Sequence, residues 1–415
     1  MSPRRVSRLR TALAAGVVAA SVVPVWAGPA AADHDAPCSV GEIPGSEPLA
    51  DTHEKDNAAF DRMHVEQAQE VATGRGVKVA VIDSGVVGVP GLDVLGSVVA
   101  GGAPNTLLSG HGTIVAGLIA GPNGVAPDAQ VFSVKVFDAE GADTAQGEKP
   151  VTSAGIVAGI EAVMKAFPQE RFDVVNISLA VPASDPKLKA AIARLVELPL
   201  VVVAAAGNRE EDDDSDDSTF KGTPGNDADV YPADYPGVVA VSATPPDDGD
   251  PSTFVVPNMD TDVAAPTVGA ISANATGQVC VVGEVATSWA AAEVSGILAL
   301  LSERFPRENP KQLVARLQAT TEGAGAPQGP DGEVESPWTG AGVVQAHDAL
   351  TRQIKSGRQG RIESTVAETR SDAQAPPAPQ RVDLFSTPRA ILLWSGLVAG
   401  SLLALAFMLR PLLRR

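Results

Sequence analysis

Three widely separated segments each place one reactive side chain at the boundary of an expected strand or helix. Asp83 follows an apolar run, His111 stands between two glycines at the start of another, and Ser288 stands where a small, polar stretch gives way to helix formers. A serine hydroxyl is inert at neutral pH without a base, and an imidazole base needs a carboxylate to fix its tautomer and orientation. These side chains are therefore the parts needed for nucleophilic catalysis by serine.

Each residue also has an ordinary structural explanation. An aspartate after a strand is usually a turn residue, a single histidine is usually structural, and Thr287 or Ser288 near a helix start is commonly only a cap. That start nevertheless offers unpaired backbone N–H groups and the positive helix end, which both stabilise an oxyanion. The structural explanations become less plausible because the three residues occur in one chain, each at the end of an expected strand or the start of an expected helix.

Alternating strand-like and helix-like runs must position these side chains. The alternation predicts an α/β domain at 76–351, with a mostly parallel sheet between helices and its chemistry at the carboxyl ends of the strands. The expected strands are 77–82, 131–136, 174–179, 199–204 and 238–242, and the expected helices are 112–120, 152–166, 186–198 and 289–305.

The composition argues against nucleic acid as a partner. The chain of 415 residues carries a net charge of −19, and aromatic residues make up 4% of it. Binding of nucleic acid needs a basic patch and commonly uses aromatic side chains for base stacking.

Both ends of the chain carry signals that are separate from the expected domain. Residues 1–32 combine arginines at the start, an apolar middle and three alanines at the end, which is typical of a secretory signal peptide; a retained anchor is the alternative. Residues 352–388 include a Pro-rich stretch and few core-forming residues. They are therefore predicted to form an extended linker.

The linker leads to a predicted transmembrane helix at 389–410. Residues 390–409 contain no charged side chain, and these 20 residues span about 30 Å as a helix. Arginines follow, so the tail at 411–415 is predicted to be cytoplasmic and the catalytic domain extracytoplasmic. The expected location is the cell membrane, with a single C-terminal span. A buried core helix is the alternative, but this stretch has no polar face.

The two cysteines, Cys38 and Cys280, suit an exported chain. Their even number permits one disulfide, and this pairing is favoured over two free thiols. Residues 33–75 form a polar extension with an expected helix at about 64–73, which is short and polar for a folded domain of its own. A bridge from Cys38 would hold this extension as a strap against the domain.

The order Asp, His, Ser along the chain is that of subtilisin, and the three segments resemble those of subtilisin-like serine proteases. Further segments that resemble this family are the strand and turn that end at Asn208, the stretch 231–241 and the stretch 262–266. The resemblance runs from about residue 74 to about residue 350. With its signal, extension, linker and terminal span, the layout is similar to the mycosins, membrane-anchored proteases associated with type VII secretion systems.

The resemblance implies a role for each matching residue. Ser288 attacks a peptide carbonyl, His111 accepts and returns the proton, and Asp83 orients the imidazole. The side chain of Asn208 and the backbone N–H of Ser288 hold the oxyanion. The substrate is a polypeptide, and the residues implied to bind it are Ser178, Leu179, Ala180, Ala205 and Gly207. No cofactor or metal is implied, and the acidic run 209–217 is interpreted as a solvated loop rather than a calcium site.

Three residues near the predicted site depart from the family pattern. Family members usually have Gly where this chain has Ala180 and Ala286, and Pro where it has Ala292. A proline in a helix crowds the carbonyl four residues earlier, which in this chain belongs to Ser288. Without that crowding we expect Ser288 to lie slightly back from the attack position and hydrolysis to be slow, because near-attack geometry is tight.

These departures leave more than one function open. The sequence predicts a membrane-anchored, extracytoplasmic serine endopeptidase associated with type VII secretion. The alternatives are a weakly active or inactive protease-fold scaffold that stabilises a secretion membrane complex, and a surface-binding module that kept the fold. Reaction of Ser288 with a fluorophosphonate probe separates a competent nucleophile from the other two.

Overall fold

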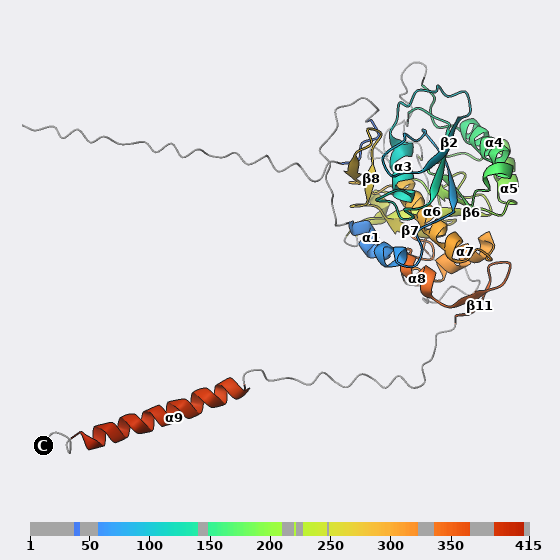
Figure 1. The fold of residues 1–415 in the computed structure, drawn as a ribbon. Helices are drawn as coiled ribbons and strands as arrows, with labels where there is room; N and C mark the ends of the chain where they lie inside the picture. The colour runs from blue at the N-terminus through green and yellow to red at the C-terminus, as the bar shows by residue number, and fades with distance from the viewer. Residues whose placement is uncertain are drawn as a thin grey trace, which may run out of the picture. The chain divides into compact units, whose positions relative to one another are not determined.

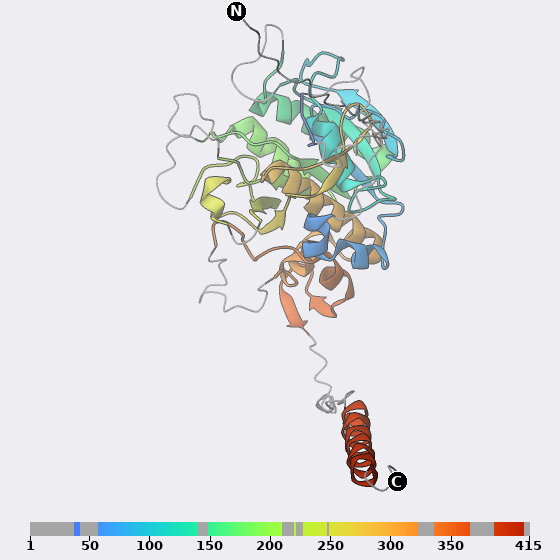
Figure 2. The ribbon, with the colours of Figure 1, turned by 90° about the vertical axis from the view of Figure 1, so that its left-hand side faces the viewer.

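The computed structural model describes residues 37–41, 57–139, 148–209, 220, 227–246, 249–322, 336–365 and 386–410. The chain divides into two units, Met1–Thr365 and Val366–Arg415. The first unit holds the main sheet, and the second holds helix α9, Ser386–Leu409 (Figure 1 and Figure 2). The predicted signal peptide and the acidic run from residue 210 to residue 217 lie outside the described residues.

A parallel sheet of seven strands forms the centre of the first unit. Its order is β2-β3-β1-β4-β5-β6-β7, and every neighbouring pair is parallel. The five expected strands are confirmed as β1 and β3 to β6, whereas β2 and β7 were not expected from the sequence. The strands are β1 Lys78–Asp83, β2 Val94–Val99, β3 Gln130–Lys135, β4 Val174–Ile177, β5 Val201–Ala205, β6 Val238–Thr244 and β7 Val263–Pro266.

Helices cover both faces of this sheet, as predicted. Along β1, Val79 and Val81 pack in one core with α3 and α6, and Ala80 and Ile82 pack in the other with α4 and α5. Burial on both faces explains why the strand sequence is continuously apolar. The four helices are α3 His111–Ile119, α4 Ser153–Glu170, α5 Pro186–Leu195 and α6 Thr287–Arg304.

Helix α6 is buried along most of its length. Every residue from Trp289 to Leu301 is buried, and the helix packs against β4, β5, β6 and α3. The small side chains of residues 290–292 allow the helix to approach its neighbours closely. The predicted nucleophile therefore stands at the start of an element fixed by the core.

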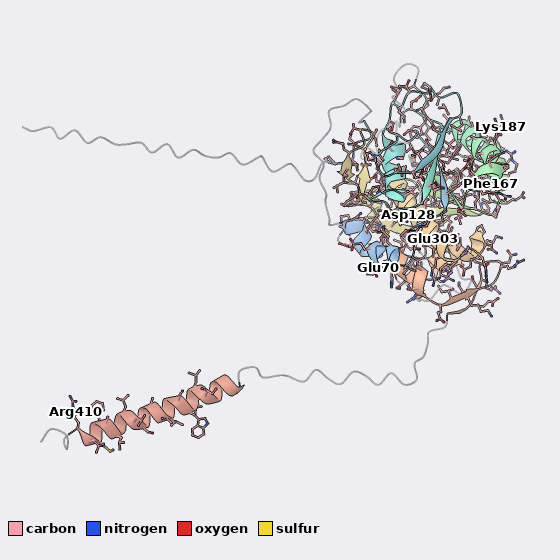
Figure 3. The ribbon with its side chains drawn as sticks, viewed as in Figure 1. Glu70, Asp128, Phe167, Lys187, Glu303 and Arg410 are labelled. Atoms are coloured by element: carbon pink, nitrogen blue, oxygen red, sulfur yellow. A yellow bond between two sulfur atoms is a disulfide. The ribbon has the colours of Figure 1, made fainter. Side chains whose placement is uncertain are left out.

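The N-terminal extension differs from the expected single helix at 64–73. It forms α1 Ala58–Met63 and α2 Val65–Gln69, separated by His64, whose backbone φ is 54°. The backbone N–H groups of residues 73–75 donate instead to Glu303 Oε2, at 2.7, 2.6 and 3.1 Å (Glu303 is labelled in Figure 3). Three such donors satisfy the carboxylate and hold this segment outside the helix.

The predicted disulfide between Cys38 and Cys280 is present. Cys280 lies in a small antiparallel hairpin, β8 Ile271–Ala273 and β9 Val279–Val281. The backbone N–H of Cys38 donates to Val281 O at 2.8 Å, so Pro37 and Cys38 lie beside this hairpin.

The linker predicted at 352–388 begins later than expected. Residues 354–365 form an antiparallel hairpin of β10 Ile354–Ser356 and β11 Ile362–Thr365, which follows the 3-10 helix Pro251–Thr253, α7 Pro310–Gln318 and α8 Ala346–Thr351. The hairpin was missed because its strands are short and polar. Residues 366–385 lie outside the described part.

In the second unit, α9 contains an exposed apolar stretch at Ile391–Leu409. Its 19 residues are long and apolar enough to cross a membrane, judged by length and composition. This agrees with the span expected from the sequence.

A buried carboxyl group inside α6 is unexplained by the packing. Glu293 is fully buried, and neither of its side-chain oxygens has a hydrogen-bond partner among the described residues. Burial raises the pKa of Glu293 well above its ordinary value, because the charged form is disfavoured without water. The neutral form of this side chain is therefore the one that folding favours.

This burial predicts a pH-dependent cost in stability. As pH rises above the ordinary pKa of glutamate, the unfolded chain loses a proton that folded Glu293 keeps, so the free energy of unfolding falls by about 1.4 kcal/mol per pH unit. We expect the melting temperature of Glu293→Gln to rise relative to wild type between pH 4 and pH 7. Glu70→Gln, at an exposed position, serves as the control. A difference between Glu293→Gln and wild type that is equal at both pH values would contradict this account.

Candidate active site

Asp83 ends β1 and is completely buried. Its Oδ1 accepts a hydrogen bond from the backbone N–H of Ser84 at 2.6 Å. A buried carboxylate is costly unless it is hydrogen-bonded. Because β1 lies between β3 and β4, this acid stands at the carboxyl edge in the interior of the sheet.

The imidazole of His111 is the second partner of this carboxylate. His111 begins α3, and its Nδ1 lies 2.8 Å from Asp83 Oδ1 and 3.0 Å from Oδ2. A carboxylate can only accept, so Nδ1 carries the hydrogen and Nε2 is the basic nitrogen of the neutral ring. The residue after His111 must be a glycine, because a β-carbon on Gly112 would lie 2.9 Å from Asp83 Oδ1.

Ser84 ties the loop of the acid to the loop of the base. Its hydroxyl accepts from Gly112 N at 2.9 Å and donates to Ser109 O at 3.2 Å. Its carbonyl accepts from the buried Lys135 Nζ at 3.2 Å, and that ammonium lies 2.6 Å from Asp138 Oδ1. The sequence did not identify this buried ion pair, although a lysine in an apolar run with an acid three residues later is a signal for it.

Aromatic rings pack against the imidazole. The His111 and Trp289 ring centroids are 4.6 Å apart at 32°, and Phe137 approaches edge-on at 6.2 Å. The indole Nε1–H of Trp289 donates to Glu284 Oε1 at 3.1 Å, which fixes the indole plane. Since Trp289 directly follows Ser288, the start of α6 lies beside the imidazole.

Ser288 is partly exposed and exchanges two hydrogen bonds with Ser178. Its hydroxyl donates to Ser178 O at 3.2 Å, and the Ser178 hydroxyl donates to Ser288 O at 2.8 Å. Within the described parts of the chain, Ser178 is the sole hydrogen-bond partner of the Ser288 hydroxyl. The structure thus brings Asp83 and His111 into contact and places Ser288 next to the residue that packs on His111.

Asn208 provides a cap for α6 from another part of the chain. The residue before the helix is Ala286, which has no capping side chain; Asn208 Oδ1 instead accepts from Thr287 N at 2.7 Å and from Thr287 Oγ1 at 2.9 Å. The sequence placed Thr287 or Ser288 near the cap but did not predict this contact. With Oδ1 engaged, the Nδ2 donors of Asn208 remain for another acceptor.

The residues expected to bind substrate follow β4 and end β5. Ser178, Leu179 and Ala180 come directly after β4, and Val181 pairs with Tyr231 through backbone hydrogen bonds of 2.8 and 2.9 Å. Ala205 is the last residue of β5, and Gly207 follows in a left-handed conformation with φ of 100°. All five lie at the same edge of the sheet as Asp83, but their role toward substrate stays a prediction.

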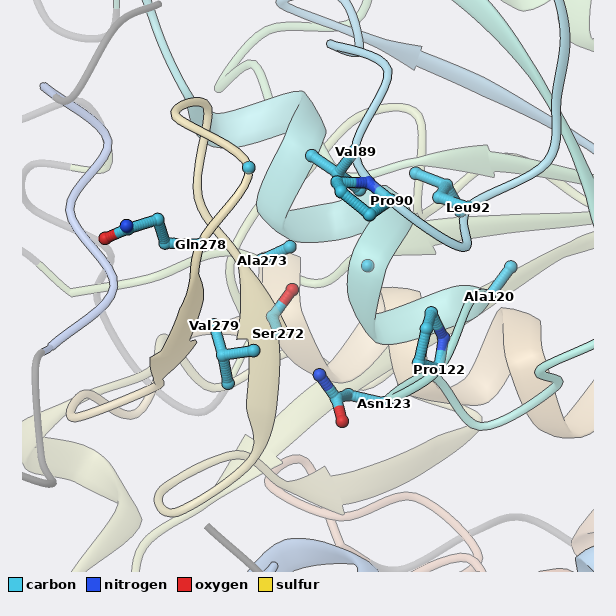
Figure 4. A pocket seen from close by; sticks show the side chains of 12 residues that line it. Val89, Pro90, Leu92, Ala120, Pro122, Asn123, Ser272, Ala273, Gln278 and Val279 are labelled. Atoms are coloured by element: carbon cyan, nitrogen blue, oxygen red, sulfur yellow. The ribbon is translucent and has the colours of Figure 1, made fainter. Parts of the chain in front are cut away.

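A separate pocket of about 340 Å³ lies beside the other end of α3 (Figure 4). Its lining includes Val89, Leu92, Asn123 and Gln278, and none of its lining residues is ionisable. It therefore offers no acid or base for proton transfer. Among the described residues, no cluster of histidine, cysteine or carboxylate side chains is placed to hold a metal ion.

Comparisons with known proteins identify relatives of this chain. The model of the subtilase family matches residues 74–342. Mycosin-1 of Mycobacterium tuberculosis is 33% identical over 333 residues, which cover 71% of this chain and 72% of that protein. Subtilisin E of Bacillus subtilis is 34% identical over 259 residues, which cover 60% and 61%. The crystal structure of MycP1 from the ESX-1 type VII secretion system matches with a TM-score of 0.60 and 28% identity, covering 78% of this chain and 91% of that one.

The family model covers more than half of the chain, and it spans the segments around Asp83, His111, Asn208 and Ser288. Mycosin-1 of Mycobacterium tuberculosis is also 33% identical, and the match covers more than two thirds of each protein. The chain therefore belongs to the subtilase family of serine proteases and is similar to the mycosins.

Proposed function

We propose that this chain is a membrane-anchored, extracytoplasmic serine endopeptidase that uses Asp83, His111 and Ser288 and takes part in type VII secretion. The observation that carries the catalytic proposal is the buried contact of 2.8 Å between His111 Nδ1 and Asp83, next to the start of α6. The likeness to MycP1 of the ESX-1 system supports the secretion role. The apolar stretch of α9 supports the anchor.

In the proposed reaction, Ser288 Oγ bonds to the carbonyl carbon of a peptide and passes its proton to His111 Nε2. The C–N bond breaks as His111 gives that proton to the leaving amine, which leaves an acyl-enzyme. Water then attacks the acyl carbon and gives a proton to His111, and the bond between that carbon and Ser288 Oγ breaks as His111 passes the proton to Oγ, which releases the acid product. Asp83 accepts the Nδ1–H bond throughout and stabilises the imidazolium.

Charge that develops on the carbonyl oxygen needs fixed donors. The backbone N–H of Ser288 and the Nδ2 group of Asn208 supply them in this proposal, at the positive end of α6. The bonds from Thr287 to Asn208 Oδ1 support this role, because they fix which end of the amide is left to donate.

The backbone after β4 is the proposed site for an extended substrate. The carbonyl of Ser178 is one acceptor that a substrate N–H can use, so the peptide adds as a strand beside residues 178–180. This acceptor now holds the Ser288 hydroxyl at 3.2 Å. Ser288 must therefore leave that carbonyl before it can give its proton to His111.

The hydrogen bond from the Ser288 hydroxyl to Ser178 O favours a second candidate function, a scaffold with little protease activity. Ala292 lies inside the uninterrupted helix α6, so nothing in the helix crowds the Ser288 carbonyl. The slow hydrolysis expected from Ala292 stays a prediction. In the scaffold case, the folded domain would serve a secretion membrane complex through its surface.

A fluorophosphonate probe separates these two functions. We expect the full-length chain in detergent to be labelled at a single residue, because only a serine activated by a base reacts readily. Labelling should vanish in Ser288→Ala and fall at least tenfold in His111→Gln, which lacks the base. Ser302→Ala, on the same helix, is the control and should be labelled like wild type. Folded wild-type protein that resists the probe would reject the protease and favour the scaffold.

The two faces of the Asn208 amide predict two different defects. Asn208→Asp keeps the acceptor for Thr287 but loses the Nδ2 donor, so kcat should fall about a hundredfold or more with little change in melting temperature. Asn208→Ala loses both, so it should also lose about 1 kcal/mol of stability with the helix cap. Peptide hydrolysis and thermal melting of both variants check this. Wild-type kcat in Asn208→Asp would contradict the oxyanion role.

A further inference from the structure

A chain of hydrogen bonds runs from the interior of α6 to the backbone of Ser288. Ser295 Oγ lies 3.0 Å from Asn176 Oδ1 and 2.8 Å from Ala291 O, and it shares its single hydrogen between these two acceptors. Asn176 Nδ2 donates to Ser178 Oγ at 2.9 Å, and Ser178 Oγ donates to Ser288 O at 2.8 Å. Ser295, Asn176 and Ser178 are 0%, 0% and 1% exposed. Water does not compete for these bonds, so each residue depends on the next.

In this series of hydrogen bonds, the donor and the acceptor of each bond are fixed. The Ser178 hydroxyl has a single hydrogen, which is donated to Ser288 O, so its oxygen must accept from the Asn176 amide. The Asn176 amide can present Nδ2 to Ser178 only if Oδ1 faces the hydroxyl of Ser295. Removing that hydroxyl frees the amide to turn, and Ser178 would then donate to Asn176 Oδ1 rather than to Ser288.

We infer that Ser295, Asn176 and Ser178 are positioning residues, which form a relay that sets the Ser288 peptide and so the place of the nucleophile. This inference rests on the proposed function. None of the three needs to touch the scissile bond. The relay links β4, which precedes the proposed substrate strand, to the helix that carries Ser288. Because near-attack distances are tight, a small shift of that peptide lowers the chemical rate more than it lowers binding.

The far end of the relay gives the cleanest test, because no hydrogen bond joins Ser295 to Ser288 in the described residues. In the full-length chain, Ser295→Ala should lower kcat for a peptide substrate on the order of tenfold and leave KM within about twofold. Its rate of reaction with a fluorophosphonate should fall by a similar factor. Ser295→Thr, which keeps the hydroxyl, should recover most of the loss.

Ser302 offers a matched control. Ser302 Oγ donates to Leu298 O at 2.8 Å, the carbonyl four residues earlier, and Ser302 lies two turns further along α6 than Ser295. Ser295 Oγ likewise lies 2.8 Å from Ala291 O, but it shares its single hydrogen between that carbonyl and Asn176 Oδ1. Ser302→Ala should therefore leave kcat and the labelling rate unchanged. Equal losses in Ser295→Ala and Ser302→Ala would show a general effect on the helix and overturn the relay.

A double-mutant cycle decides whether Ser295 acts through Ser178. If it does, Ser295→Ala causes no further loss of kcat in a Ser178→Ala background. Losses that multiply would overturn the proposal, because they show two independent contributions.

Failure of the relay can be told apart from failure of the proposed function. An unlabelled wild-type chain would reject the protease itself, and the relay is then judged from crystal structures of wild type and Ser295→Ala. The relay predicts that the Asn176 amide turns and that the bond between Ser178 Oγ and Ser288 O is lost. An unchanged bond in Ser295→Ala would overturn the inference in that case as well.

Discussion

The hydrogen bond between the Asp83 carboxylate and the His111 ring is the constraint on which the rest of the site depends. Both side chains are nearly or fully removed from water, so the carboxylate needs its partners in place. The centre of a parallel sheet supplies the acid, and the start of α3 supplies the base. Gly112 lets these two elements approach, since any larger residue there would strike the carboxylate.

The N-terminal end of α6, which carries Ser288, is also held in place, and the residues that hold it include some from outside the helix. Asn208 caps it through Thr287, Ser178 bonds to the Ser288 carbonyl, and Trp289 packs on the imidazole. The small residues that follow let the helix lie deep in the core. The same depth leaves Glu293 without a partner in the described structure, so tight placement of the nucleophile coexists with an unfavourable buried carboxyl group.

Much of this arrangement could be predicted from sequence because each reactive residue stands at the end of a strongly patterned element. The runs before Asp83 and Asn208 and the helices after His111 and Ser288 were all recognisable by hydrophobic pattern. Contacts across the chain were not: Asn208 and Thr287 are 79 positions apart, and Ser178 and Ser288 are 110 apart. Local pattern also missed the left-handed His64 that splits α1 from α2, and the polar strands of the β10–β11 hairpin.

The most direct measurement is proton NMR of the full-length chain with labelled histidine, aimed at the hydrogen between His111 Nδ1 and Asp83. A buried ring hydrogen that is donated to a carboxylate should give one strongly deshielded, slowly exchanging signal. We expect this signal to disappear in Asp83→Ala and in His111→Gln, and to persist in Ser288→Ala. A wild-type spectrum without such a signal, or a signal that survives Asp83→Ala, would contradict the arrangement on which the proposed protease depends.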